Sequence, residues 1–325
     1  MRRILSIAAV LLGSLTTVQA QAPAQTPPQS WPQRNVTLIL PLGPGSGVDI
    51  TSRLLAEKLS AKWGKPVVIE NRPGGDAIVA INAFLSANDD HTFFMAPTST
   101  FTAHPFIHSK LPYQPEDLVP IARVTNTLIA VGVPASLGVN TLDEFVKLAK
   151  EKPGQLNWAG TTGAVDFMTA GFLKAANIDV TKVPYKDGVQ ALNDLAEGRI
   201  QLYGAAYAIM RPQVQAGKVK VLALLNKERA PQLPDVPTAI EAKHPAFAID
   251  GLVGMFGNRN LSPELRDRIS ADVVEAAKDP SIEQKLAATG QVVRPGGAKE
   301  FSAEIEDQRA RIAEAAKNTG IKPTN

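Results

Sequence analysis

The sequence predicts an α/β fold with two domains, each a mostly parallel β-sheet flanked by helices. The chain has 325 residues, which is enough for two domains with separate cores. From Asn35 onward, short apolar runs alternate with longer runs of helical periodicity, the order typical of βαβ units and parallel sheets. The alternation pauses at a proline-punctuated stretch near 104–120 and then resumes, which indicates a second unit. A single large sheet is the alternative.

The first unit is expected in the order βαβαβ. Its predicted strands cover 36–41, 66–71 and 92–96, because each is a short run of apolar residues rich in Val, Ile, Leu or Phe. Its predicted helices cover 49–63 and about 77–87, where apolar residues recur with helical spacing.

The second unit is expected to begin with a strand at 128–134 and a helix after Thr141, which forms a capping box with Glu144. A serine cap at Ser262 before a first-turn proline predicts a helix in the tail. A last helix is expected near Ala298. The remaining predicted elements are strands at 156–160, 180–185, 200–206 and 218–225, and helices at about 166–176 and 189–197.

This order predicts where the chain passes between the domains. Domain 1 is expected to comprise 35–124 and 227–325, and domain 2 to comprise 125–226. Two such crossings leave a cleft between the domains, which is a preferred place for a small ligand.

The N-terminus has the layout of a secretory signal peptide over residues 1–20. Two arginines precede an apolar run, and small residues end the segment at a cleavage site near Ala20. A membrane anchor is the alternative, but the apolar run is shorter than the roughly 20 residues that span a bilayer. Residues 21–34 are rich in Pro, Gln and Ala and are expected to form a disordered leader.

Charge and cysteine content exclude several classes of partner. Removing Arg2 and Arg3 with the signal lowers the formal charge from +3 to 3 − 2 = +1, which predicts no nucleic-acid partner. The chain has no cysteine, so disulfides and thiolate metal sites are excluded. Asp89, Asp90 and His91 have the composition of an exposed turn rather than the spacing of metal ligands. The sequence therefore predicts neither a metal nor a cofactor.

A glycine-rich loop follows the first strand. Gly43, Gly45 and Gly47 allow a sharp turn and a close approach of a ligand to the main chain, and Ser46 adds a hydroxyl. The helix that follows offers unpaired amides and the positive end of its dipole, which favours an anion. A plain structural turn is the alternative.

Nucleotide-binding and hydrolase motifs fit this loop poorly. The loop lacks the Lys-Ser/Thr ending of a P-loop and the last glycine of a dinucleotide fingerprint. Pro44 and Val48 replace the glycines of a nucleophile elbow around Ser46. The protein is therefore not expected to be an enzyme, and a secreted serine hydrolase remains as an unfavoured alternative.

A matching loop opens a helix in the second unit, at Thr161, Thr162, Gly163 and Ala164. If the two helix N-termini face each other across the cleft, each can hold a carboxylate with backbone amides and hydroxyls. Such a site needs no buried arginine, and the nearby Arg53 is expected to face solvent.

Six separated segments resemble the solute receptors of tripartite tricarboxylate transporters, also called Bug receptors. They include VTLILPLGPGSGVDITSRLLAEKLSAKWGKPVVIENRPGG, KLPYQPEDLVPIARV, AKEKPGQLNWAG, VPYKDGVQALNDLAEGRIQ, QAGKVKVLAL and APQLPDVPTAIEA, in the order of the family. The resemblance implies a type II (Venus-flytrap) periplasmic binding protein. It would bind a small di- or aromatic carboxylate and deliver it to membrane permease subunits, and it is expected to be a monomer. A sensor role in a two-component system is the alternative.

The resemblance also implies which residues contact the solute. It points to the loops 42–49 and 160–165 and to a third region at 98–100. Asp166 either caps its own helix or meets a donor on the solute, and tyrosines on the cleft side either flank an aromatic ligand or belong to the core. The expected contacts are Leu42, Gly43, Pro44, Gly45, Ser46, Gly47, Asp49, Thr98, Ser99, Thr161, Thr162, Gly163, Ala164, Asp166, Tyr185 and Tyr207.

Overall fold

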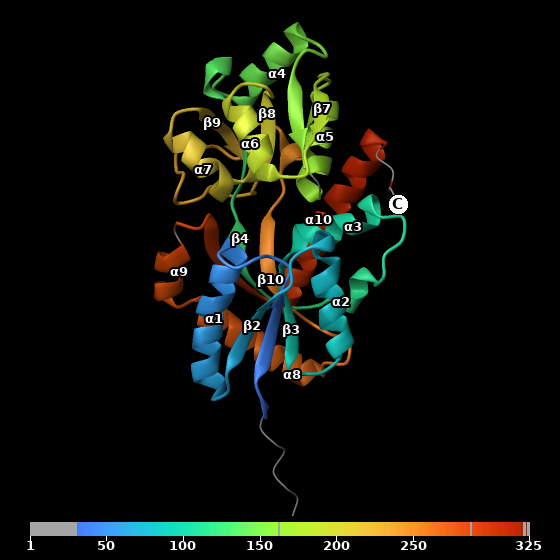
Figure 1. The fold of residues 1–325 in the computed structure, drawn as a ribbon, viewed down its shortest axis with the longest axis vertical. Coiled ribbons are helices and arrows are strands. Elements are labelled where there is room, and N and C mark those ends of the chain that lie inside the picture. The colour runs from blue at the N-terminus through green and yellow to red at the C-terminus, as the bar shows by residue number, and fades with distance from the viewer. Residues whose placement is uncertain (1–30, 162, 287, 321–322, 324–325) are drawn as a thin grey trace, which may run out of the picture.

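The computed structural model describes residues 31–161, 163–286, 288–320 and 323. Two β-sheets lie one above the other along the longest axis of the molecule, and each is flanked by helices (Figure 1). The predicted two-sheet α/β architecture is therefore confirmed. The predicted signal peptide and most of the predicted leader lie outside the described residues.

The end of the predicted leader is packed against the first sheet. Trp31 is buried, its indole donates a hydrogen bond to the Asp90 carbonyl at 2.8 Å, and its ring meets that of Trp63 edge-on with centroids 4.8 Å apart. Trp31 was expected in a disordered segment, but its large apolar ring is ordered by burial in this aromatic cluster.

The first sheet has six strands in the order β11-β4-β10-β3-β1-β2. β1 pairs in parallel with β2 and β3, whereas β3-β10, β10-β4 and β4-β11 are antiparallel pairs. The sheet is thus mixed rather than mostly parallel, because its other half is built from segments on either side of the second unit. The strands are β1 (Val36–Leu40), β2 (Val67–Asn71), β3 (Thr92–Pro97), β4 (Val119–Thr127), β10 (Gly251–Gly257) and β11 (Gln291–Gly297).

Helices cover both faces of the first sheet. Along β1, Leu38 and Leu40 belong to one core cluster with α1 and α8, whereas Ile39 belongs to the other with α2, α3 and α10. This alternation is the period-two pattern of a strand buried on both faces. The helices are α1 (Gly47–Trp63), α2 (Ile78–Ala87), α3 (Thr98–Ile107), α8 (Pro263–Ala277), α9 (Pro280–Leu286) and α10 (Ala298–Thr319), with short 3₁₀ turns η1 (Gly75–Ala77) and η2 (Pro115–Asp117).

The second sheet has five strands in the order β7-β6-β8-β5-β9 and is also mixed. β6 is parallel to β7 and β8, and β5 is antiparallel to β8 and β9. The elements are β5 (Ile129–Pro134), η3 (Ala135–Leu137), α4 (Leu142–Glu151), β6 (Asn157–Gly160), α5 (Ala164–Ala175), β7 (Thr181–Pro184), α6 (Gly188–Ala196), β8 (Leu202–Ala206), α7 (Tyr207–Gln215), β9 (Val219–Leu224) and η4 (Pro245–Phe247).

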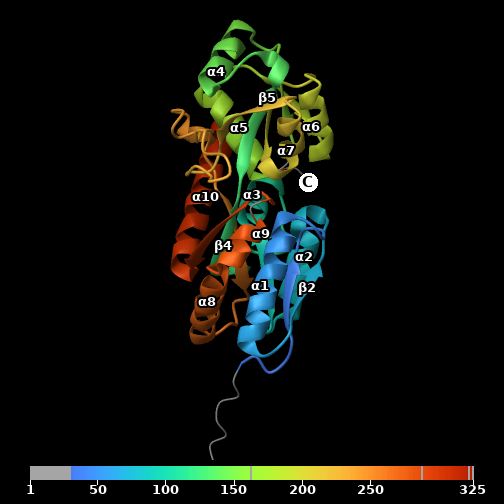
Figure 2. The same cartoon turned by 90° about the vertical axis from the view of Figure 1, so that its left-hand side faces the viewer.

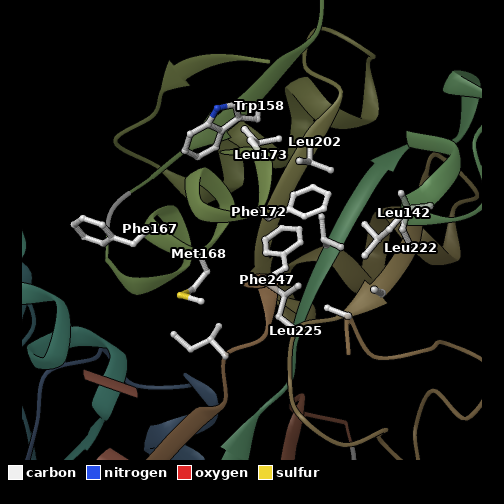
Figure 3. Close-up of a cluster of buried hydrophobic side chains, with 14 of the residues drawn as sticks. Leu142, Trp158, Phe167, Met168, Phe172, Leu173, Leu202, Leu222, Leu225 and Phe247 are labelled. Carbon is white, nitrogen blue, oxygen red and sulfur yellow. The ribbon is translucent and has the colours of Figure 1, made fainter. Parts of the chain in front are cut away.

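The core of the second unit includes a segment that sequence analysis placed elsewhere. Phe172 of α5 stacks on Phe247 with ring centroids 4.5 Å apart (Figure 3). Ala239 and Ile249 belong to the same buried cluster. Residues 227–250, expected in domain 1, therefore pack partly on the second sheet, because their few apolar side chains complete its core.

The chain changes sheets at two points that lie side by side. It leaves β4 at Thr127 and enters β5 at Ile129, and it returns to the first sheet at Gly251. Gly251 pairs with Thr127, which brings the two points together. Asn226 braces the first point, because its side chain accepts from the Ile129 amide at 2.8 Å and donates to the Thr127 carbonyl at 3.0 Å. The chain thus passes from the first sheet to the second at Leu128. The predicted division into domains, with its crossing near 124, stays a prediction.

Two helices that sequence analysis missed begin beside this crossing. α3 and α7 each contain a proline, and that of α3, Pro105, lies in the proline-punctuated stretch near 104–120; that of α7 is Pro212. Proline removes an intrahelical hydrogen bond. Tertiary packing compensates in α3, since its Phe101 is buried against Phe256.

The C-terminal helix α10 connects the two units. Its Phe301 lies in the core of the first sheet, whereas Ile312, Ala315 and Ala316 lie in the core of the second. Figure 2 shows α10 running along one side of the molecule from the lower unit toward the upper one. No helix within the described ranges is both long and apolar enough to cross a bilayer.

Candidate ligand-binding cleft

A cavity of about 650 Å³ lies between the two sheets. It lies where the chain crosses between the units, since Thr127, Ile129 and Gly251 line it. Its volume is in the range of small-molecule sites.

The first turns of four helices line the cavity. The second residue of each of these helices faces it: Val48 in α1, Ser99 in α3, Val165 in α5 and Ala208 in α7. The first amides of a helix have no intrahelical partner, and the helix dipole places partial positive charge there. The cavity therefore lies at four positive helix ends, of which sequence analysis anticipated those of α1 and α5.

The start of α1 is shaped by its loop. Gly45 has a φ of +83°, which favours glycine, and Ser46 caps the helix by accepting the Asp49 amide at 3.2 Å. Gly47 and Val48, the first two residues of the helix, both line the cavity. A Cβ on Gly47 would lie 2.8 Å from the Gln291 side chain, so glycine also lets α1 approach β11 closely.

Asp49 holds this loop in place rather than lining the cavity. Its carboxylate is buried and accepts from the Gly45 amide, Asn71 and Arg53 at 2.9–3.0 Å. Burial alone would raise the pKa of Asp49, but the hydrogen bonds from Arg53, Gly45 and Asn71 hold that pKa below its ordinary value. Asn71 also donates to the Leu42 carbonyl at 2.8 Å. The carboxylate is thus an ionised anchor for the backbone.

Asp166 holds the loop before α5 in the way that Asp49 holds the loop before α1. Like Asp49, it is the third residue of its helix, and it accepts from the upstream amide of Thr161 at 2.9 Å. It also pairs with Lys182 at 2.8 Å. Burial raises the pKa of Asp166, although Lys182 and the Thr161 amide partly offset this effect. Neither of the two roles left open by the sequence describes these contacts: α5 has no side-chain cap at Gly163, and Asp166 instead holds the loop before the helix through the Thr161 amide.

The lining of the cavity is mostly apolar and uncharged. Among the described residues that line it, none carries a charge, and hydroxyl and amide groups supply its polarity. Gln291 is fixed at the floor, since its amide accepts from Thr125 at 2.9 Å and donates to Thr127 at 2.9 Å. The polar side chains of the lining are those of Ser46, Ser99, Thr127, Thr289 and Gln291.

The structure sorts the sequence-predicted residues into three groups. Those that line the cavity are Leu42, Gly45, Ser46, Gly47 and Ser99. Those that do not are Gly43, Pro44, Asp49, Thr98, Thr161, Gly163, Ala164, Asp166, Tyr185 and Tyr207. Thr162 lies outside the described residues. Lining residues that sequence analysis missed are Val48, Ile50, Pro97, Thr127, Ile129, Val165, Ala206, Ala208, Ile209, Gly251, Ala288, Thr289 and Gln291.

Three of the predicted contacts have other partners. Thr98 donates to Gln308 of α10 at 2.7 Å. Tyr185 donates to Asp194 at 2.7 Å, and burial together with this hydrogen bond raises the pKa of Tyr185 to about 12. Tyr207 packs against the hydrophobic cluster on one face of the second sheet. The tyrosines therefore fit the core role that the sequence left open.

The missed lining residues are mostly small or aliphatic, and no sequence signal singles them out.

Two α/β units joined by crossing strands, with a cleft at the crossing, define the class of two-domain solute-binding proteins. The family model of the tripartite tricarboxylate transporter family receptor matches residues 51–321. The chain belongs to this family, which comprises periplasmic solute receptors rather than enzymes.

Curated relatives and solved structures resemble the chain over most of its length. The protein in the tcbD-tcbE intergenic region of a Pseudomonas species is 29% identical over 281 residues, which are 85% of this chain and 83% of the relative. BugT of Bordetella pertussis is 25% identical over 99% of both chains. An R. palustris protein solved with adipate has a TM-score of 0.77 and 26% identity, covering 90% of this chain and all of the other. MatC from Rhodopseudomonas palustris with bound malate has a TM-score of 0.71 and 25% identity, covering 88% and 99%.

Proposed function

We propose that this protein binds a small organic carboxylate, di- or aromatic, in the cleft between its two sheets. The convergence of four helix N-termini on an uncharged cavity carries the proposal. Oriented amides in a partly dry site attract an anion without a counter-charged side chain. The similar proteins that carry adipate and malate support a carboxylate as the anion.

The proposed contacts come from both units. In the first unit, the loop 42–47 supplies the amides of Gly47 and Val48 and the hydroxyl of Ser46, and α3 supplies Ser99. In the second unit, Gly163 and Ala164 supply backbone amides when the two units close about the crossing near Leu128, since the Thr161 amide is already bound by Asp166. Asp49 and Asp166 hold these loops rather than touching the solute.

The proposed cellular role follows from the family. We expect export to the periplasm with cleavage of the signal near Ala20, a monomeric receptor, and delivery of the bound carboxylate to the permease subunits of a tripartite tricarboxylate transporter. The receptor family and the signal-like N-terminus support this role.

A thermal-shift and calorimetry series tests the proposal. Adipate, malate and an aromatic monocarboxylate are compared with their neutral amides. A ligand at a hundredfold excess over its dissociation constant should stabilise the protein by about 2.7 kcal/mol. We expect at least one carboxylate to do so while its amide does not. Equal shifts with the neutral amides, or none across a broad carboxylate panel, would contradict the proposal.

A negative charge placed in the first turn of α5 should strongly weaken carboxylate binding. Val165 is only partly buried and lines the cavity, so Val165→Asp should fold while placing a carboxylate where the solute is bound. Repulsion at a few ångströms should weaken binding by roughly 100-fold. Val165→Asn is the matched neutral control, and calorimetry should show a much smaller loss for it. Equal losses in both variants would show that size, not charge, matters there.

A further inference from the structure

Three potential metal ligands converge on the first unit, away from the cleft. Asp76 lies in η1, before α2, while His104 lies in α3 and His108 directly follows that helix. Asp76 Oδ2 is 3.3 Å from His104 Nε2 and 3.3 Å from His108 Nε2. One ligand atom from each residue lies within 4.8 Å of the other two. None of the three lines the cleft.

These distances suit metal ligands and are long for hydrogen bonds, although His108 Nε2 and Asp76 Oδ2 do meet in one long hydrogen bond at 3.3 Å. Two atoms that each lie about 2.0–2.1 Å from a tetrahedral Zn²⁺ are about 3.3–3.4 Å apart. A hydrogen bond between an imidazolium and a carboxylate is shorter, at about 2.7–2.9 Å. Both distances from Asp76 match the edge of a zinc tetrahedron, and all three ligand atoms lie within 4.8 Å of one another.

His104 supplies the second observation. Its ring is fully buried, and its Nε2 faces Asp76 but makes no hydrogen bond within the described ranges. A buried polar atom without a partner is costly, so its orientation calls for a ligand. Its other nitrogen, Nδ1, lies 2.6 Å from the Tyr113 hydroxyl, and a partner of this kind fixes the ring of a metal-binding histidine.

We propose that Asp76, His104 and His108 bind one divalent transition-metal ion, for which Zn²⁺ has the best-fitting geometry. The fourth position is open to water, because the Asp76 and His108 side chains are 34% and 28% exposed. The sequence predicted no metal because it offers no compact ligand motif. The carboxylate precedes His108 by 32 residues, and only the packing of η1 against α3 joins them. The ion would tie η1 to α3, whose Ser99 lines the cleft.

Titration calorimetry with ZnCl₂ on the full chain, purified without a polyhistidine tag and stripped with EDTA, tests the site. We expect one ion per chain, and Co²⁺ should give the visible absorption of a tetrahedral complex. His108→Ala and Asp76→Asn should each lower Zn²⁺ affinity by about 100-fold, as a lost ligand removes one of three protein contacts. His104→Ala should also lower Zn²⁺ affinity by about 100-fold. Because this ring is buried, the variant could fail to fold, and in that case His108→Ala and Asp76→Asn carry the test.

His244→Asn is the matched control. His244 also contacts a carboxylate, with Nε2 2.8 Å from Asp143, but it lies outside the cluster. Its substitution should leave stoichiometry and affinity unchanged. The assignment is overturned if the full chain binds no Zn²⁺, if His108→Ala and Asp76→Asn bind it as tightly as the parent, or if His244→Asn alone removes binding.

Discussion

Replacing Asp49 with alanine should destabilise the protein by about 2–4 kcal/mol and weaken carboxylate binding by roughly tenfold or more. The carboxylate is buried and accepts from the Gly45 amide, Asn71 and Arg53. Removing it leaves these donors without their acceptor and releases the loop that positions the amides of Gly47 and Val48. Urea unfolding measures the first effect, and calorimetry with the best carboxylate measures the second.

Arg53→Ala is the control for this prediction. The Arg53 side chain is half exposed and pairs with Asp49, so its loss removes a cation but leaves the carboxylate bonded to Gly45 and Asn71. Salt bridges at exposed positions contribute only about 0–1 kcal/mol. Most of the affinity should therefore remain. If Arg53→Ala abolished binding while Asp49→Ala did not, the arginine would be the anion receptor and the role of the helix amides would be refuted.

Gly251→Ala should also strongly lower the stability of the protein, because Gly251 lies at the crossing between the units. An added Cβ would lie 2.3 Å from the Thr127 carbonyl oxygen, which is backbone and cannot rotate away. That oxygen also accepts from Asn226, which holds the Ile129 amide as well. Forcing the two strands apart should cost about 3 kcal/mol or more and disturb the cavity floor. Urea unfolding and carboxylate titration should both register the change.

Gly43→Ala is the matched substitution at a loop position. A Cβ there would have no atom within 4 Å, and the residue does not have a positive φ. The free energy of unfolding of Gly43→Ala should stay within about 0.5 kcal/mol of that of the parent protein. If both glycine variants were equally stable, the strands at the crossing would be more adaptable than their close approach indicates.

Local patterns predicted part of the site well. The strand 36–40 and the helix that follows the glycine-rich turn are encoded by an apolar run, a turn and helical periodicity, all of which act within a few residues, whereas the cap at Ser46 was not predicted. The same logic anticipated the start of α5. These features could be predicted because their physical causes are local.

Two of the four helix starts at the cavity could not be predicted in this way. α3 and α7 contain Pro105 and Pro212, so local rules argued against helices there. Contacts with distant elements, such as that of Phe101 with Phe256, compensate for the lost hydrogen bonds. The role of Asp49 was likewise hidden, because its partner Asn71 is distant in sequence.

The sequence alone determined the two α/β units, the resemblance to solute receptors and the two glycine-rich loops that begin α1 and α5. Only the tertiary structure decided which side chains brace the loops, which residues line the cavity, and that Asp76 meets His104 and His108. Local patterns encode strands, caps and turns because those depend on neighbouring residues. The cleft depends on the crossing near Thr127 and Gly251, where segments far apart in the chain are brought together by burial of their apolar faces.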